Sequence, residues 1–259
     1  MTQPEKEVSA KRTETKKKEP FQASSQEEAP DKKSDEIRSK QLLAAYMKQG
    51  REKLTAFFDD HGISLPVIGV AMEQFTQSVF DLPEGAACKQ GCAYCCHLKV
   101  GVSIPEALVI YNELAAQTTP EGFEFLKDRV LVVAKKGNIL EEAFWLTTRT
   151  PCPFLNIDKN HLCMIYSLRP FSCRAYHSTE LAACQKSFEQ GDEALIPCFP
   201  LYRATTDMYA SIFTRVLAGK GFFSYQVRFI KAIEILFKDK PHQTNGLTRR
   251  MCLKQQNFS

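Results

Sequence analysis

The sequence lacks the segments that would send a chain into or across a membrane. Its longest apolar-leaning run, ISLPVIGVAM from Ile63, is about half as long as a membrane-spanning helix must be. The opening residues, MTQPEKEVSAKRTETKKKEP, carry charges with no apolar stretch after them, which is not the pattern of a signal peptide. These absences predict a cytoplasmic protein with no membrane partner, in a compartment where disulfides are rare.

The sequence also has little excess charge and no glycine-rich strand–helix turn. The formal net charge is only +4, and no basic stripe interleaved with aromatic residues appears, so there is no strong nucleic-acid signal. The missing turn is the kind that would bind S-adenosylmethionine. Neither a Ser–His–Asp set nor a pair of carboxylates stands out. Catalytic residues, a substrate and a protein partner are therefore not assigned from the sequence.

The two ends of the chain differ in composition from its middle. Residues 1–38 are rich in Lys, Glu, Gln, Ser and Pro, and they contain few large apolar residues. Such a segment cannot bury enough apolar surface to offset its ordering entropy, so we expect it to be disordered. We expect a helical metal-binding domain over 39–240, with its cysteine-rich core at 84–200, and a loose polar tail over 241–259.

The pattern of apolar residues predicts a mainly α fold. Ser103, followed three residues later by Glu106, has the spacing of a capping box at a helix start. Residues 150–200 hold many Cys, Pro and aromatic residues without a long period, so we expect loops and short helical turns there. Helical spacing predicts helices over 39–61, 67–80, 104–117, 121–136, 140–148, 203–218 and 222–238.

Cysteine is what the sequence has in abundance, with ten among 259 residues. Ten thiols in a reducing compartment need an explanation other than disulfides, and thiolate–metal bonding is the leading one. Thiolates are strong ligands for zinc, Cu(I) and iron–sulfur clusters. One group of cysteines is dense and the other is spread along the chain: Cys88, Cys92, Cys95 and Cys96, then Cys152, Cys163, Cys173 and Cys184.

The dense group can converge on a metal, although not all of it on one small ion. Cys88, Cys92 and Cys95 can meet because Gly91 lets the loop turn tightly. Neighbouring side chains usually diverge, so Cys95 and Cys96 are expected to serve two metals, or one centre and its bridge. Two groups of about four ligands indicate either one polynuclear centre or two neighbouring sites.

Other residues near the cysteines have secondary roles in this interpretation. Lys89, Arg169 and Arg174 are candidates to offset the negative charge of a thiolate centre, together with the N–H groups of the helix that begins near Ile104. His97 and His177 are interpreted as hydrogen-bonding residues, and Cys252 as a buried structural thiol. The sequence leaves open whether His97, His177 or Cys198 joins the site.

The spacing Cys88-x3-Cys92-x2-Cys95 also matches the three-cysteine signature of radical S-adenosylmethionine enzymes. In that family the motif follows the first strand of a βα barrel. Here the preceding residues, IGVAMEQFTQSVF, have a helical pattern, and no strand–helix alternation follows. We therefore reject this interpretation, because a short motif without its structural context is weak.

Both cysteine regions together resemble a known family. CKQGCAYCCHLKVGVSIPEALVI resembles the first block of the bacterial CxxCxxCC, or YkgJ-type, cysteine-cluster proteins, and CPFLNIDKNHLCMIYSLRPFSCRAYHSTELAAC resembles their second block. One departure is that three residues, not two, separate Cys88 from Cys92. The family is described as zinc- or iron-chelating. The resemblance implies a ligand set of Cys88, Cys92, Cys95, Cys96, Cys152, Cys163, Cys173 and Cys184.

The resemblance leaves two classes of function open. In the first, the chain is a metal-binding protein that holds zinc or iron, the iron including a [4Fe–4S] cluster, in a process that is not predicted. In the second, the centre is an iron–sulfur or polynuclear-iron site of an enzyme. A relative of this cysteine pattern occurs in flagellin lysine methylases, so the enzyme would be a protein-modifying one.

Overall fold

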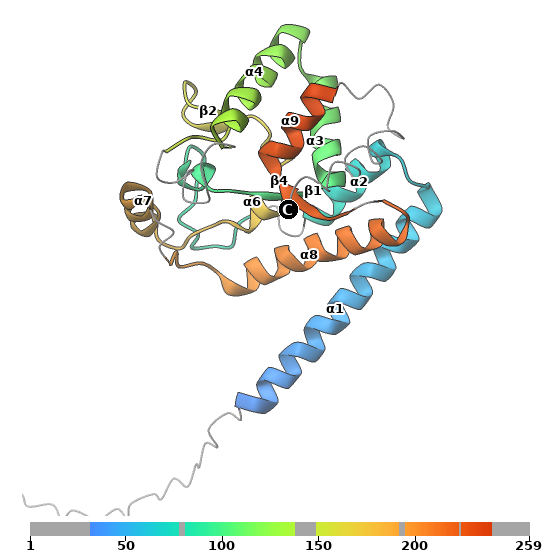
Figure 1. Cartoon of the computed structure of the whole chain (residues 1–259). Coiled ribbons are helices and arrows are strands. Elements are labelled where there is room, and N and C mark those ends of the chain that lie inside the picture. Colours follow the sequence, from blue (N-terminus) through green and yellow to red (C-terminus); the bar gives the residue numbers. More distant parts are fainter. Residues whose placement is uncertain (1–31, 78–80, 138–148, 192–194, 223, 240–259) are drawn as a thin grey trace, which may run out of the picture. The chain divides into compact units, whose positions relative to one another are not determined.

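The computed structural model describes residues 32–77, 81–137, 149–191, 195–222 and 224–239 (Figure 1). Within these ranges the chain is mainly helical, as the sequence predicts. It divides into a unit that ends at Gln41 and a second unit that begins at Leu42. Helix α1 (Lys32–His61) begins inside the predicted tail 1–38. Residues 1–31 of that tail and the whole tail 241–259 lie outside the described residues.

One hydrophobic cluster of the second unit joins α1 to helices α2 (Leu65–Thr76) and α8 (Pro200–Gly219). Helix α1 ends at His61, as its predicted range does, and Gly62, with a φ of 72°, follows it. The side chain of Ser64 accepts a hydrogen bond from Val67 N, so α2 begins two residues before its predicted start. The cluster includes Leu54, Phe58, Ile68, Ile212 and Phe213.

The second cluster is formed by helices α3 (Ile104–Gln117), α4 (Pro120–Gly137) and α9 (Phe229–Asp239). Figure 1 shows α9 lying beside α3 and α4, and both pairs are in contact. The capping box predicted at Ser103 and Glu106 is present at the start of α3. The predicted helix at 140–148 lies outside the described residues.

Strand β1 (Gly101–Ser103) pairs in antiparallel register with β4 (Gln226–Arg228), Val102 lying opposite Val227. The prediction of a helix from residue 222 is therefore wrong at its start, because 226–228 pair with another segment and the helix begins only at Phe229. Phe229 N donates to Val100 O at 2.9 Å. This pairing places the start of α9 beside the segment that follows the dense cysteine group.

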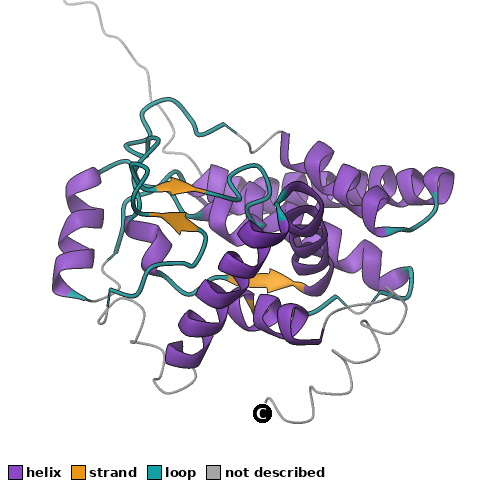
Figure 2. Ribbon diagram, turned by 90° about the horizontal axis from the view of Figure 1, so that it is seen from above, coloured by secondary structure: helices purple, strands orange, loops and turns teal. Residues whose placement is uncertain are grey.

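The cysteine-rich region forms short elements, as predicted for 150–200. They are the 3-10 helix η2 (Tyr94–His97), strands β2 (Leu155–Asn156) and β3 (Leu162–Cys163), and helices α6 (Phe171–Ala175) and α7 (Leu181–Gln190). Figure 2 shows the β2–β3 hairpin surrounded by loops and separate from β1. Among the helices of the described ranges, none combines the length and hydropathy of a membrane-spanning segment.

Candidate metal centre

The loop that carries Cys88 and Cys92 is shaped by a tight turn. Cys92 N donates to Lys89 O at 3.0 Å, and Gly91 within this turn has a φ of 86°. A Cβ added at Gly91 would lie 3.0 Å from Asn160 O, so the loop also approaches the β2–β3 hairpin closely. Both the positive φ and the close approach favour glycine, which confirms the role predicted for Gly91.

A backbone hydrogen bond joins the dense cysteine group to the spread one. Cys95 and Cys96 lie on η2, where Cys96 N donates to Ala93 O at 2.9 Å. Cys152 N donates to Cys96 O at 2.8 Å. Two cysteines more than 50 residues apart in the sequence are thus held side by side by their main chains.

The β2–β3 hairpin presents Cys163. Cys163 lies opposite Leu155 in the antiparallel register, and Met164 N donates to Phe154 O at 2.9 Å. The turn of the hairpin is made by Asn160 and His161, which have φ values of 51° and 57°. The hairpin therefore carries Cys163 on a short, hydrogen-bonded support.

Helix α6 presents Cys173 and is anchored from α3. Phe171 N donates to the Glu106 carboxylate at 3.0 Å, and this carboxylate also accepts from Ser103 N and from the Ser103 hydroxyl. Glu106 is only 2% exposed. The side chain that caps α3 therefore also fixes the start of the helix that carries Cys173.

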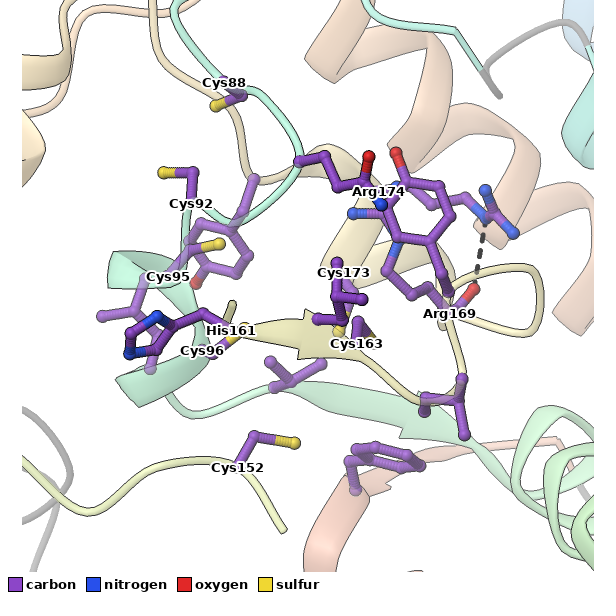
Figure 3. A pocket seen from close by; sticks show the side chains of 18 of the residues that line it. Cys88, Cys92, Cys95, Cys96, Cys152, His161, Cys163, Arg169, Cys173 and Arg174 are labelled. Atoms are coloured by element: carbon purple, nitrogen blue, oxygen red, sulfur yellow. Dashed lines mark hydrogen bonds between the residues drawn. The ribbon is translucent and has the colours of Figure 1, made fainter. Parts of the chain in front are cut away.

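Seven of the eight predicted ligands line one cavity of about 570 Å³. Figure 3 shows Cys88, Cys92 and Cys95 on one side of this cavity, and Arg169 and Arg174 on the other. Cys184, on α7, does not line the cavity, although its charge interacts with those of Cys92 and Cys95. The cysteines that line it are Cys88, Cys92, Cys95, Cys96, Cys152, Cys163 and Cys173.

Two pairs of thiols share hydrogen bonds. The bond that Cys88 donates to Cys92 lowers the pKa of Cys92 to about 6 and raises the pKa of Cys88. Cys88 Sγ in turn accepts from Ser178 N at 3.3 Å. The hydrogen bond from Cys95 to Cys96, together with burial, raises the pKa of Cys95. The pKa of Cys92 is thus shifted toward neutral pH, whereas the shifts at Cys88 and Cys95 oppose ionisation.

The three cysteines of the spread group that line the cavity hold their protons more tightly than free thiols. Burial raises the pKa of Cys152, Cys163 and Cys173. Nearby arginine charges act in the opposite direction, since Arg169 favours the thiolates of Cys163 and Cys173. A bound cation would supply the positive charge that these desolvated thiols need in order to become thiolates.

The donors around the cavity fit a soft or borderline metal. No Asp or Glu is among the described residues that line it, so the available protein ligands are sulfurs and His161. Thiolates select zinc, Cu(I) and iron–sulfur clusters over magnesium or calcium. No three metal-ligating side chains within the described ranges lie close enough to enclose an ion as they stand.

The histidines take different positions around this cavity. His177 hydrogen-bonds through both ring nitrogens: Nδ1 lies 3.0 Å from Ala175 O, and Nε2 accepts from Phe199 N at 2.8 Å. His97 Nδ1 lies 3.2 Å from Ala93 O, and its ring contacts Phe188. These contacts agree with the hydrogen-bonding roles expected from the sequence. His161 is exposed and also lines the cavity.

The structure adds residues that sequence reasoning missed. The predicted counter-charges Lys89, Arg169 and Arg174 all line the cavity. Lys99 and the segment Arg228–Ile230 line it too. The segment Arg228–Ile230 was missed because its apolar residues have helical spacing, which predicts a continuous helix where strand β4 in fact precedes α9.

Comparison with known proteins gives one result that bears on this centre. Residues 87–194 match the model of the CxxCxxCC family, described as a "putative zinc- or iron-chelating domain". No curated protein and no solved structure matches the chain. The matched span covers less than half of the sequence and contains all eight predicted ligands. The resemblance of the two cysteine blocks is thereby confirmed, and residues 87–194 are similar to the CxxCxxCC domain.

Proposed function

We propose that this protein binds zinc or iron in the 570 Å³ cavity through thiolates of both cysteine blocks. The observation that carries the proposal is that seven thiols reach one cavity from separate segments: the 88–92 loop, η2, the segment at Cys152, the β2–β3 hairpin and α6. All nine cysteines of the described ranges are free thiols. A set of free thiols around one cavity, with no Asp or Glu among the described residues that line it, is the donor chemistry of a thiolate metal site.

The proposed ligands are the seven cysteines that line the cavity, with Cys184 as the eighth. Cys184 lies on α7, and its charge interacts with those of Cys92 and Cys95, which supports its inclusion. Eight thiolates suffice for two closed tetrahedral zinc sites. A [4Fe–4S] cluster takes four and leaves the others for a second metal.

The metal is identified by analysing protein purified without air. Zinc would give a colourless protein with stoichiometric metal, whereas iron in a thiolate or cluster site would absorb visible light. Removing the metal with a chelator should lower the free energy of unfolding, because a metal that binds only the folded state stabilises that state. Protein that holds neither zinc nor iron after anaerobic purification and reconstitution would refute the proposal.

Serine substitutions test the ligand set. Cys95→Ser and Cys163→Ser should lose bound metal, because each removes a thiolate from a different wall of the cavity. Cys198→Ser is the matched control, since Cys198 is a free thiol that does not line the cavity. Cys252→Ser should likewise keep the metal. Full metal content in Cys95→Ser would contradict the assignment of that residue.

One observation favours the alternative of an iron–sulfur enzyme. The cavity falls within the roughly 300–1,000 Å³ range of small-molecule sites, so it can hold more than a metal ion. Under this alternative the protein would be brown when purified without air and would bleach under oxygen. The cytoplasmic location stays a prediction from the sequence.

A further inference from the structure

We propose that the same cavity also binds a small organic anion, with its oxyanionic group against Arg169 and its apolar body against Phe229 and Ile230. The inference rests on the proposed metal site, because it concerns the part of the cavity that the thiolates leave free. The ligand class proposed for that part is a small organic anion, and Arg169 is the residue proposed to recognise it.

The volume of the cavity exceeds what thiolate-bound metals need. A zinc–sulfur bond of about 2.3 Å defines a coordination sphere of roughly 50 Å³. Two such spheres would take about 100 Å³, a small part of the 570 Å³ that is present. The remaining space is large enough for a small organic molecule, which proteins bind in cavities with mostly apolar walls and a few polar anchors.

The other side chains that line the cavity are suited to an anion with an apolar part. Phe229, Ile230, Val100 and Ile165 supply apolar surface, of which Phe229 is the largest side chain. The charged residues that the structure places around the cavity are all cationic, and none is a carboxylate: Lys89, Lys99, Arg169, Arg174 and Arg228.

Arg169 has the geometry of an anchor for a planar oxyanion. Its guanidinium carbon lies 4.0 Å from the centre of the Tyr166 ring, so one face of the guanidinium is covered and its edge is left for hydrogen bonds. Its Nε is buried and has no hydrogen-bond partner. A buried donor without an acceptor is costly, and a carboxylate or phosphate bound in a bidentate manner would satisfy it.

Two hydrogen bonds from Arg174 hold the loop that presents Arg169. Arg174 Nε donates to Arg169 O at 3.2 Å, and its Nη2 donates to Ser167 O at 2.7 Å. Arg174 is only 2% exposed and lies on α6. The backbone at Arg169 is thus fixed before any ligand arrives, which lowers the entropy that binding would otherwise lose.

A simpler role for Arg169 is to balance the charge of the thiolates, and the two roles predict different results. A counter-charge changes the metal content when it is removed, and it creates no affinity for added anions. An anchor for a ligand leaves the metal content unchanged and gives the protein a preference for an acid over its uncharged amide.

The test uses the full-length, metal-loaded protein and a matched pair of probes, 4-phenylbutyrate and 4-phenylbutyramide, in isothermal titration calorimetry. The acid should bind at least about tenfold more tightly than the amide, the ratio expected for a charge-assisted bidentate pair. Arg169→Gln should abolish this preference at unchanged metal content. Arg169→Lys should lose most of it, because an ammonium keeps the charge but not the planar fork.

The control variant is Arg51→Gln, which makes the same charge change on an exposed residue of α1 outside the cavity. It should keep the tenfold preference. Equal binding of acid and amide, no saturable binding of either probe, or a preference that survives in Arg169→Gln would overturn the inference. Metal content is measured on each sample. Unsubstituted protein that holds no metal refutes the proposed function, whereas metal-loaded unsubstituted protein without an acid preference refutes the anion site alone. Loss of metal in Arg169→Gln would make Arg169 a counter-charge and overturn the inference.

Discussion

Replacing Glu106 with alanine should weaken the fold and the metal centre together. The carboxylate is buried, and it accepts from Ser103 N at 2.9 Å, from the Ser103 hydroxyl at 2.6 Å and from Phe171 N at 3.0 Å. It therefore links the start of α3 to the start of α6, two residues before Cys173. An alanine removes all three bonds at once.

The magnitude follows from the donors that are left behind. The N–H groups of Ser103 and Phe171 would lose this acceptor at a buried site, at about 1–3 kcal/mol each. Removal of a buried carboxylate offsets part of this loss, because its own desolvation is unfavourable. We expect the free energy of unfolding to fall by about 2–4 kcal/mol.

The assay is urea unfolding followed by circular dichroism, with and without a chelator so that bound metal does not mask the change. Glu113→Ala is the matched control, because Glu113 lies on the same helix and accepts an exposed hydrogen bond from Gln117. It should change the free energy of unfolding by less than about 0.5 kcal/mol. Glu106→Gln should lose about half as much as alanine, since its single oxygen can serve Ser103 or Phe171 but not both.

The reasoning would be refuted if Glu106→Ala matched Glu113→Ala in stability. It would also be refuted in part if Glu106→Ala were destabilised but kept its full metal content, because α6 would then not depend on this carboxylate to present Cys173.

The pH dependence gives a second readout for the same residue. Burial raises the pKa of Glu106 above its ordinary value of 4.5, so the folded state binds this proton more tightly than the unfolded state does. Stability from this group is therefore fully present below the ordinary pKa and falls as pH rises through the raised one. Glu106→Gln should remove this decline, which unfolding at a series of pH values will measure.

Two further predictions concern the metal loop and α9. Gly91→Ala should destabilise the protein by about 1–2 kcal/mol from its positive φ alone, and by more because the added Cβ would lie 3.0 Å from the carbonyl oxygen of Asn160. Gly62→Ala is the control, because Gly62 has open space around it. Equal losses of stability in urea unfolding would contradict the close approach at Gly91. At Glu234, burial acts to raise the pKa, but hydrogen bonds from Lys231 and Lys238 bring it below the ordinary value. Its stabilisation is thus present above the ordinary pKa and lost on acidification, and Glu234→Gln should flatten that acid loss in pH-dependent unfolding.

The parts of the fold that sequence reasoning predicted are those with local causes. The start of α3 was visible because Ser103 and Glu106 lie three residues apart and satisfy each other's backbone. The turn at Gly91 could be predicted because glycine allows the tight backbone turn by which Cys88 and Cys92 can converge. Loops and short helical turns could be predicted over 150–200 because the apolar residues there show no long periodic pattern.

The parts that were missed depend on distant partners. Strand β4 has three residues, too few for an alternating pattern, and Val227 fits the helical spacing of the residues that follow it. Only its pairing with β1 makes it extended. The positions of Lys99 and Arg228 at the cavity could not be predicted for the same reason. For Cys184 the family resemblance gave a role, but the placement of α7 depends on tertiary contacts.

The β1–β4 pairing has a consequence for how the chain can be divided. Residues 87–194 hold every proposed ligand, yet Val102 and Ile104 are fully buried within a cluster that contains Phe229 and Ile233. Excision of that segment alone would strip this covering and open one wall of the cavity to water. We therefore expect the cysteine segment to depend on the surrounding helices for its folding, so substitutions in α9 should alter the metal centre without replacing any cysteine.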